Sequence, residues 1–243
     1  MKLSIRGVIV LAFLTLIGCS KSPQSDAGKW TDILKEGNMD MFREPVGTWI
    51  TALDVVLDPE NEQHLTYLEG SGVLVSGRTG QTTNLLTKME YGDIEAHIEF
   101  MVPAKSNSGV YFQGRYEIQV LDSWGVENPQ YLDCGGIYQR WADNKGFEGR
   151  APRVNACRKP GEWQSYDVIF KAPRFDKDGN KIANAVFVKV VHNGILIHEN
   201  QEVAGPTRSG SYEDEAPLGP LMFQGDHGPV AYRNIRVRPI NFE

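Results

Sequence analysis

The sequence predicts an all-β fold, a two-sheet antiparallel jelly-roll β-sandwich. Apolar and polar residues alternate with a period of two along many short segments, whereas helical periodicity is scarce. Glycine, asparagine and proline separate these segments, as is typical of antiparallel sandwiches. The composition agrees with this prediction, because 41% hydrophobic and 23% charged residues are ordinary for a globular protein of 243 residues.

The N-terminal segment predicts an exported lipoprotein. Basic residues precede an apolar run at 8–17, which is too short to span a bilayer but fits a signal peptide. The run ends in Leu16-Ile17-Gly18-Cys19, which resembles a bacterial lipobox with Cys19 as the lipidated residue. An ordinary signal peptide with a chance cysteine is the alternative.

This interpretation divides the chain into three parts. We expect residues 1–19 to be the lipoprotein signal peptide and lipobox, residues 20–29 a tether, and residues 30–243 a single jelly-roll domain. The mature protein is then expected in the bacterial cell envelope, lipid-anchored on the periplasmic face of the outer membrane.

Two cysteines remain once Cys19 is assigned to lipid. Export implies an oxidising compartment, so Cys134 and Cys157 are candidates for a disulfide that closes the 22 residues between them. The alternative is two buried free thiols. Metal binding by this pair is not expected, because no Cys-x-x-Cys motif or nearby His pair accompanies them.

The expected strands follow one another between turn-forming residues. The alternation that starts at Ile94 runs to Met101, and Pro103 ends it. A hairpin is expected where Asn193-Gly194 joins two apolar runs, because these residues tolerate the positive φ angles of a type I′ turn. The other expected strands cover residues 72–76, 109–113, 116–122, 164–171, 185–192, 195–199, 218–224 and 231–239.

One long stretch, residues 123–161, has few strand signals and many turn formers. It is too long for a passive connector in a compact domain, so we expect a functional loop there.

A row of polar and aromatic side chains is expected on one sheet face. If the strands at 109–113 and 116–122 pair, alternation places on one face Tyr111, Gln113, Glu117 and Gln119. Carboxylates and amides bind sugar hydroxyls, and an aromatic ring covers the apolar face of a sugar. The row therefore predicts a solvent-lined carbohydrate site, with a ligand-free outer face as the alternative.

Two more residues are candidates for chemistry. Glu117 and Asp122 could form a carboxylate pair acting on a glycosidic bond, but residues five apart share a face only at a bulge or strand end. The central amide of Glu-x-Gln-x-x-Asp also differs from the Glu-x-Asp-x-x-Glu of some glucanases. His227 follows Asp226 after a strand and is a candidate base or metal ligand, or else a solvent-facing turn residue.

An ordered series of motifs resembles the 3-keto-disaccharide hydrolase domain family, which has a concanavalin-like jelly roll. The motifs lie at residues 91–95, 107–112, 116–122, 136–138, 160–163, 193–194, 219–224, 227–228 and 232–235. The resemblance covers roughly residues 30–239. Many relatives carry Arg where this chain has Gln113, and the loop at 124–134 is particular to this sequence.

The resemblance implies cleavage of glycosides that are oxidised to a ketone at C3. The ketone acidifies the C2 proton, so a base can remove it, the C1 substituent leaves by β-elimination, and water then adds. The family implies Glu117, Asp122 and His227 as base, acid and metal-ligand candidates, with the roles among them left open. The implied sugar contacts are Tyr111, Gln113, Gln119, Tyr138 and Gln224.

The implied cofactor is unknown, although a divalent metal ion bound by Glu117 and His227 could polarise the ketone. The expected partners are a glycoside or disaccharide substrate and, through the lipid anchor, the membrane. With 31 acidic and 25 basic residues and no basic stripe, the chain is not expected to bind nucleic acid. A non-catalytic carbohydrate-binding lipoprotein, a conventional retaining glycosidase and a structural envelope lipoprotein remain as alternatives.

Overall fold

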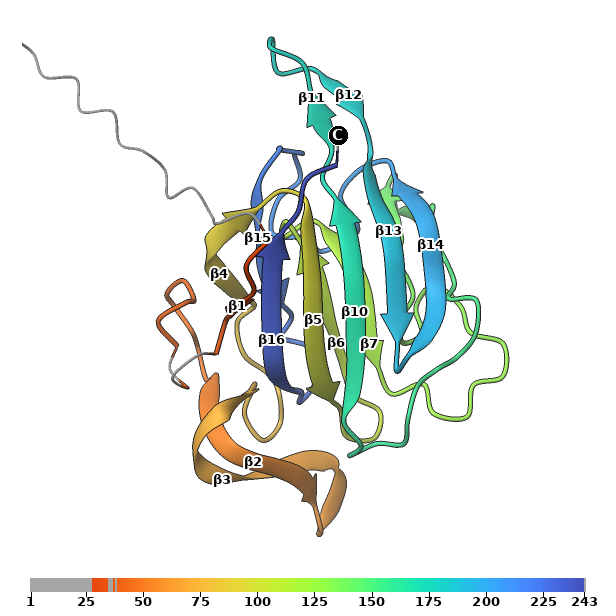
Figure 1. Cartoon of the computed structure of the whole chain (residues 1–243). Helices are drawn as coiled ribbons and strands as arrows, with labels where there is room; N and C mark the ends of the chain where they lie inside the picture. The colour runs from red at the N-terminus through yellow and green to blue at the C-terminus, as the bar shows by residue number, and fades with distance from the viewer. Residues whose placement is uncertain (1–27, 35–36, 38, 243) are drawn as a thin grey trace, which may run out of the picture.

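Two antiparallel sheets form the body of the molecule, which confirms the predicted jelly-roll sandwich (Figure 1). The computed structural model describes residues 28–34, 37 and 39–242, and these contain no α-helix. The apolar run at 8–17, the lipobox and Cys19 lie outside the described residues. Within the described part of the chain, no helix is long and apolar enough to cross a membrane.

The larger sheet has eight strands in the order β14-β13-β10-β5-β16-β3-β2, with β1 paired to β16. In Figure 1 the long β2–β3 hairpin leaves this sheet at one end. The bounds are β1 (Thr31–Asp32), β2 (Ile50–Asp58), β3 (Asn61–Val75), β5 (Ile94–Met101), β10 (Gln164–Lys171), β13 (Ala185–His192), β14 (Ile195–Val203) and β16 (Ala231–Pro239).

The smaller sheet has four strands in the order β4-β15-β6-β7. They are β4 (Leu85–Tyr91), β6 (Asn107–Phe112), β7 (Tyr116–Leu121) and β15 (Gly219–Phe223). Two short hairpins lie outside the main sheets: β8 (Arg140–Ala142) with β9 (Lys145–Phe147), and β11 (Arg174–Phe175) with β12 (Lys181–Ala183). The predicted loop at 123–161 therefore contains a small hairpin.

The core lies between the two sheets. Alternation on β5 and β7 turns one side chain in two inward, so that Ile98 and Ile118 join one buried cluster. Aromatic rings connect the sheets, with centroids 5.3 Å apart for Phe112 and Phe170. Each large apolar side chain buried here contributes roughly 1.5–3 kcal/mol.

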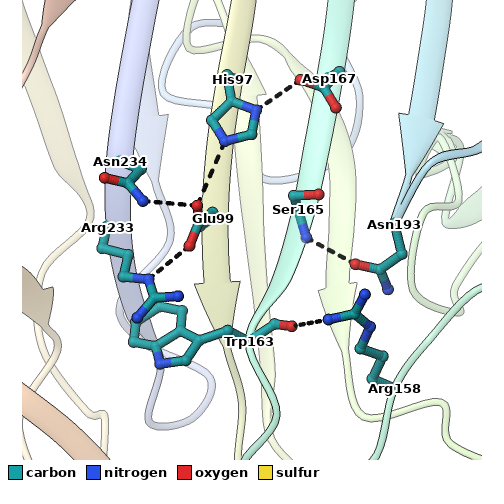
Figure 2. Close-up of polar contacts among 9 residues, drawn as sticks. All are labelled: His97, Glu99, Arg158, Trp163, Ser165, Asp167, Asn193, Arg233 and Asn234. Carbon is teal, nitrogen blue, oxygen red and sulfur yellow. Dashed lines mark hydrogen bonds and ion pairs between the residues drawn. The ribbon is translucent and has the colours of Figure 1, made fainter.

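The outer face of the larger sheet carries charged and polar side chains instead (Figure 2). His97 on β5 lies 2.6 Å from Asp167 on β10, and Glu99 accepts a hydrogen bond from Arg233 on β16 at 2.6 Å. The Arg233 guanidinium also stacks 4.0 Å above the Trp163 ring. This network spans three neighbouring strands and gives β5 the one wet face that its alternation predicts.

Candidate active site

A cavity of about 140 Å³ lies against the face of the smaller sheet that is turned away from the core. The structure brings six of the predicted residues to its wall: Tyr111, Glu117, Gln119, Tyr138, Gln224 and His227. Three residues that sequence reasoning did not select complete the wall: Asn107, Arg208 and Ser209.

Strand register explains why these side chains meet. In the β6–β7 pair Tyr111 lies opposite Glu117, and Gly109 lies opposite Gln119. The hairpin turns at Gln113 and Gly114, which both have positive φ, at 56° and 64°. The resulting antiparallel register places polar side chains on one face and core side chains on the other.

Neighbouring segments add the remaining wall. The backbone amide of Gln224 donates a hydrogen bond to the Gly109 carbonyl at 2.9 Å, which places the end of β15 beside β6. The Tyr138 amide donates to the Glu117 carbonyl at 3.2 Å, and the Glu117 amide donates to Thr207 Oγ1 at 3.1 Å. These contacts bring the segments around Tyr138 and Thr207 alongside β7.

Glu117 is buried, with 2% of its surface exposed, and its Oε2 atom has no hydrogen-bond partner. Burial raises the pKa of its carboxyl group to about 8, the negative charge of Asp226 raises this pKa further, and a hydrogen bond with the Tyr111 hydroxyl opposes the shift. The expected solvent-lined face is therefore covered. A carboxyl group with a pKa near the working pH suits a general base.

Gly109 gives Glu117 the space that it occupies. A Cβ atom at position 109 would lie only 2.2 Å from Glu117 Oε1. The glycine in the Asn-Ser-Gly motif is thus a condition for the position of the carboxylate.

Three buried oxygens in this wall lack hydrogen-bond partners: Glu117 Oε2, Asn107 Oδ1 and Gln224 Oε1. Unsatisfied buried acceptors are uncommon and cost roughly 1–3 kcal/mol each. Their convergence on one cavity indicates a ligand that supplies hydrogen-bond donors or a positive charge.

A divalent cation fits part of this donor set. No group of three or more His, Cys, Asp and Glu side chains in the described ranges could hold a metal ion. A cation would therefore be held by Glu117 together with the amide oxygens of Asn107 and Gln224, which are hard donors suited to Mg²⁺ or Ca²⁺. His227 is a nitrogen donor on the same wall.

His227 lies on the connection between β15 and β16, with its side chain 49% exposed. Its Nδ1 atom lies 2.6 Å from Asp226 Oδ1. This pairing favours a proton on Nδ1, so Nε2 is the atom left for a ligand.

Two predicted site residues lie elsewhere. Gln113 is in the turn after β6, where the positive φ ends the alternation, and its amide donates to the carbonyls of Tyr91 and Pro217, both at 3.0 Å. Its prediction as a sugar contact is wrong for this structure, because the side chain is a buried structural link.

Asp122 is also outside the cavity. Strand β7 ends at Leu121, and the Asp122 carboxylate accepts hydrogen bonds from the backbone amides of Lys105 at 2.9 Å and Trp124 at 3.2 Å. It stabilises a turn and forms no catalytic pair with Glu117, so the predicted carboxylate pair is wrong for this structure.

The structure contains Cys134 and Cys157 as free, buried thiols, so the predicted disulfide is not formed in it. The two thiols lie within hydrogen-bonding reach of each other. The hydrogen bond with Cys134 lowers the pKa of the Cys157 thiol. Cys134 Sγ also lies 3.2 Å from the Tyr166 hydroxyl, which donates to the Gln119 carbonyl at 2.6 Å. The pair therefore lies directly behind the strand that carries the candidate base.

The overlooked wall residues differ in how far sequence could have found them. Asn107 starts β6 on the same face as Gly109 and Tyr111, so extending the alternation by one step would have included it. Arg208 comes from an irregular segment, and its backbone amide donates to the Gln139 carbonyl at 2.8 Å. No local pattern predicts such a long-range contact.

Comparisons with known proteins identify the family of the chain. The family described as "3-keto-alpha-glucoside-1,2-lyase-like domain" matches residues 29–238. A solved structure from Parabacteroides distasonis, described as a "putative glycosyl hydrolase", is 31% identical, covers 71% of this chain and 73% of its own, and has a TM-score of 0.55.

A second protein of that organism, with the same description, is 20% identical, covers 87% of this chain and 100% of its own, and has a TM-score of 0.54, which supports the fold alone. No curated protein matches the chain. Since the family match spans nearly all described residues and agrees with the motif resemblance, the chain belongs to the 3-keto-alpha-glucoside-1,2-lyase-like domain family.

Proposed function

We propose that this carbohydrate-active enzyme cleaves 3-keto-glycosides by removing the C2 proton and expelling the C1 substituent. The observation that carries the proposal is Glu117, a buried carboxyl group with a pKa of about 8 in a cavity lined by unpaired oxygens. Membership of a family described as lyase-like supports the same chemistry.

The proposed reaction balances as follows. The Glu117 carboxylate takes the C2 proton, and the C2–H electron pair forms an enolate with the C3 carbonyl. As the carbonyl reforms, a C1=C2 double bond forms and the C1–O bond breaks with its electrons on the leaving oxygen, which gains a proton. Water then adds its hydroxyl to C1 and a proton to C2, so the net result is hydrolysis.

The remaining wall residues have supporting roles in this proposal. His227, oriented by Asp226, would protonate the leaving oxygen from Nε2 while in its imidazolium form, in which both ring nitrogens carry a proton. Asn107, Gln119 and Gln224 would accept or donate hydrogen bonds to the sugar hydroxyls, and Tyr111 and Tyr138 would contact its ring.

A bound divalent cation would supply Lewis-acid polarisation of the C3 ketone. The amide oxygens of Asn107 and Gln224 and one oxygen of Glu117 would hold it, which leaves the other Glu117 oxygen to take the C2 proton and His227 Nε2 to protonate the leaving oxygen. Elemental analysis of the purified protein, followed by chelation and re-addition of Mg²⁺, Ca²⁺ or Zn²⁺, tests this part separately.

A conventional retaining glycosidase needs two carboxyl groups roughly 5–5.5 Å apart on either side of the scissile bond. Glu117 is the one carboxylate among the described residues that line the cavity. This observation favours the elimination mechanism over the double-carboxylate mechanism.

The test uses residues 20–243 of the protein. It is incubated with methyl glucosides, glucosyl disaccharides and their 3-keto derivatives, with and without chelator, and release of the leaving group is measured. We expect release from the 3-keto compounds alone. Binding without turnover would support a carbohydrate-binding module instead, and turnover of unoxidised sugars would support a conventional glycosidase.

A further inference from the structure

A second hollow, of about 500 Å³, adjoins the candidate active site. It lies between the β8–β9 hairpin and the segment at 206–213. Arg208 and Ser209 line both the hollow and the catalytic cavity, so the two spaces share one wall. Its volume falls within the roughly 300–1,000 Å³ of typical ligand sites.

The hollow presents aromatic rings to solvent. Trp141 is 43% exposed and Phe147 is 37% exposed. The Arg208 guanidinium lies 4.0 Å from the centre of the Trp141 ring, and the Arg140 guanidinium lies 5.1 Å from the centre of the Phe147 ring. Each ring is therefore held in place by a cation while part of its surface stays open.

The hairpin that carries these rings is rigidly built. Its turn residues, Asp143 and Asn144, have φ angles of 50° and 57°, as a type I′ turn requires. Arg140 also forms an ion pair with Glu148 at 2.9 Å. A short hairpin with a fixed turn can hold an aromatic ring in one position without contributing to the core.

Arg208 links the hollow to the catalytic cavity. Its carbonyl lies 3.4 Å from the Tyr111 hydroxyl, which also interacts with Glu117. Its guanidinium has no carboxylate partner within the described part of the chain, so its charge and its hydrogen-bond donors remain available to a ligand.

We propose that this second hollow binds the leaving-group sugar ring of a disaccharide, with Trp141 as its stacking platform. This inference rests on the proposed function. In a disaccharide oxidised in its non-reducing ring, the other ring is attached through the oxygen of the scissile bond, so it must lie in a space next to the catalytic cavity. The Arg208 guanidinium covers one face of the Trp141 ring, so the C–H face of the sugar would contact the part of the ring that stays exposed, while the guanidinium donates hydrogen bonds to the sugar hydroxyls.

The test compares two substrate classes in three variants. The substrates are 3-keto-maltose and 3-keto-cellobiose against methyl 3-keto-α- and β-glucoside. Trp141→Ala should lower the ratio of kcat/KM for the disaccharide to that for the methyl glycoside by about tenfold, mainly through KM, the scale of one aromatic contact. Trp141→Phe should restore most of the ratio.

Trp124→Ala is the matched control. Trp124 is also exposed, at 53%, and lies under a cation, Lys159, but it lines neither space. We expect the ratio of kcat/KM for the disaccharide to that for the methyl glycoside to be the same in Trp124→Ala as in the wild type. An unchanged ratio in Trp141→Ala would overturn the leaving-group site and leave the proposed function standing.

Calorimetric titration with unoxidised maltose and cellobiose separates the two proposals. If no 3-keto compound is turned over, the proposed function fails. The sugar site in the hollow is then supported if Trp141→Ala weakens disaccharide binding about tenfold and Trp124→Ala does not. The site is overturned if Trp124→Ala weakens disaccharide binding equally. It is also overturned if the wild type binds neither disaccharide. If an aryl 3-keto-glucoside shows the Trp141 dependence and the disaccharides do not, the sugar assignment is wrong.

Discussion

At the scale of single residues, the buried position of Glu117 lowers the stability of the folded protein and raises the basicity of the carboxylate. Its carboxyl group is buried with an unpaired oxygen, and this burial raises its pKa to about 8. The folded protein therefore holds a proton at Glu117 that the unfolded chain has already released above pH 4.5. The burial that makes the charged carboxylate unfavourable in the folded protein also makes it basic enough to remove a proton from carbon.

Replacing Glu117 with Gln should abolish most turnover of 3-keto-glycosides. The substitution keeps the size of the side chain and removes its basicity, so we expect a loss of about 100-fold or more in kcat, the usual scale for a general base. In the wild type, kcat/KM should rise with pH and level off above about 8, as Glu117 loses its proton. Near-wild-type turnover by a folded Glu117→Gln protein would remove this residue from the mechanism and leave His227 as the leading base.

The same variant should be more stable than the wild type in alkaline solution. Because the folded pKa lies above the unfolded value, wild-type stability falls as pH rises from about 4.5 to about 8, at roughly 1.4 kcal/mol per pH unit. Urea unfolding at pH 5 and pH 9 should show that Glu117→Gln gains about 4 kcal/mol relative to the wild type over this interval. Parallel stability curves for the two proteins would show that Glu117 is not protonated in the fold.

At the scale of elements, the β6–β7 hairpin shows what alternation can and cannot predict. The period of two correctly places Tyr111, Glu117 and Gln119 on one face, because it holds as long as the strand continues. It fails for Gln113, which lies one residue beyond β6. Asp122 lies one residue beyond β7, and its pairing with Glu117 required an exception to the alternation that the structure does not contain. Strand ends depend on turn conformation, which a local pattern locates only to within a few residues.

The hairpins outside the main sheets were harder to predict. The β8–β9 hairpin has three residues in each strand and too little alternation to be detected. The wall residue Arg208 reaches the cavity through a backbone contact with Gln139, far away in sequence. Such contacts follow from the closed fold, so only the structure reveals them.

Adding a methyl group at Gly109 should displace the Glu117 carboxylate without changing the chemical identity of this residue. Gly109→Ala would place a Cβ atom 2.2 Å from Glu117 Oε1, so the carboxylate must move. We expect kcat/KM to fall by about 10–100-fold, since small misplacements of catalytic groups are costly, and stability to fall by about 1–3 kcal/mol. Steady-state kinetics and urea unfolding measure both effects.

Gly92→Ala is the control for this substitution, because a Cβ atom there meets Leu218 only at 3.3 Å and lies outside the cavity. The double variant Gly109→Ala/Glu117→Gln should lose little more activity than Glu117→Gln alone. Strictly additive losses would contradict an effect of Gly109 through Glu117.

At the scale of the whole molecule, the two sheets divide the work. The larger sheet supplies more of the buried core residues than the smaller sheet and has a charged outer face, and the smaller sheet carries the cavity on its far side. The sandwich itself was predictable, because a long strand such as β10 shows clear alternation over its full length. The segments that cover the site were not predictable from the sequence, since they are irregular and pack over β7 through long-range contacts.

Attachment of the whole protein to the envelope remains a prediction from the lipobox-like sequence at 16–19. Cys19→Ala should move the protein from the membrane pellet to the soluble fraction, because the lipid would have no acceptor. Fractionation of cells followed by immunodetection measures this. A Cys19→Ala protein that still pellets with the membrane would rule out anchoring through this residue.

Strand β7 has an evolutionary consequence, because it encodes the hydrophobic core and the reactive face in alternate residues. Deleting or inserting one residue in this strand would exchange the two sets, placing Ile118 in the cavity and Glu117 in the core. Lineages of this protein can therefore change length in the surrounding loops but scarcely within this six-residue strand. New substrate preferences should arise mainly in the segments around residues 124–134, 140–147 and 206–213, while β7 varies only by substitution.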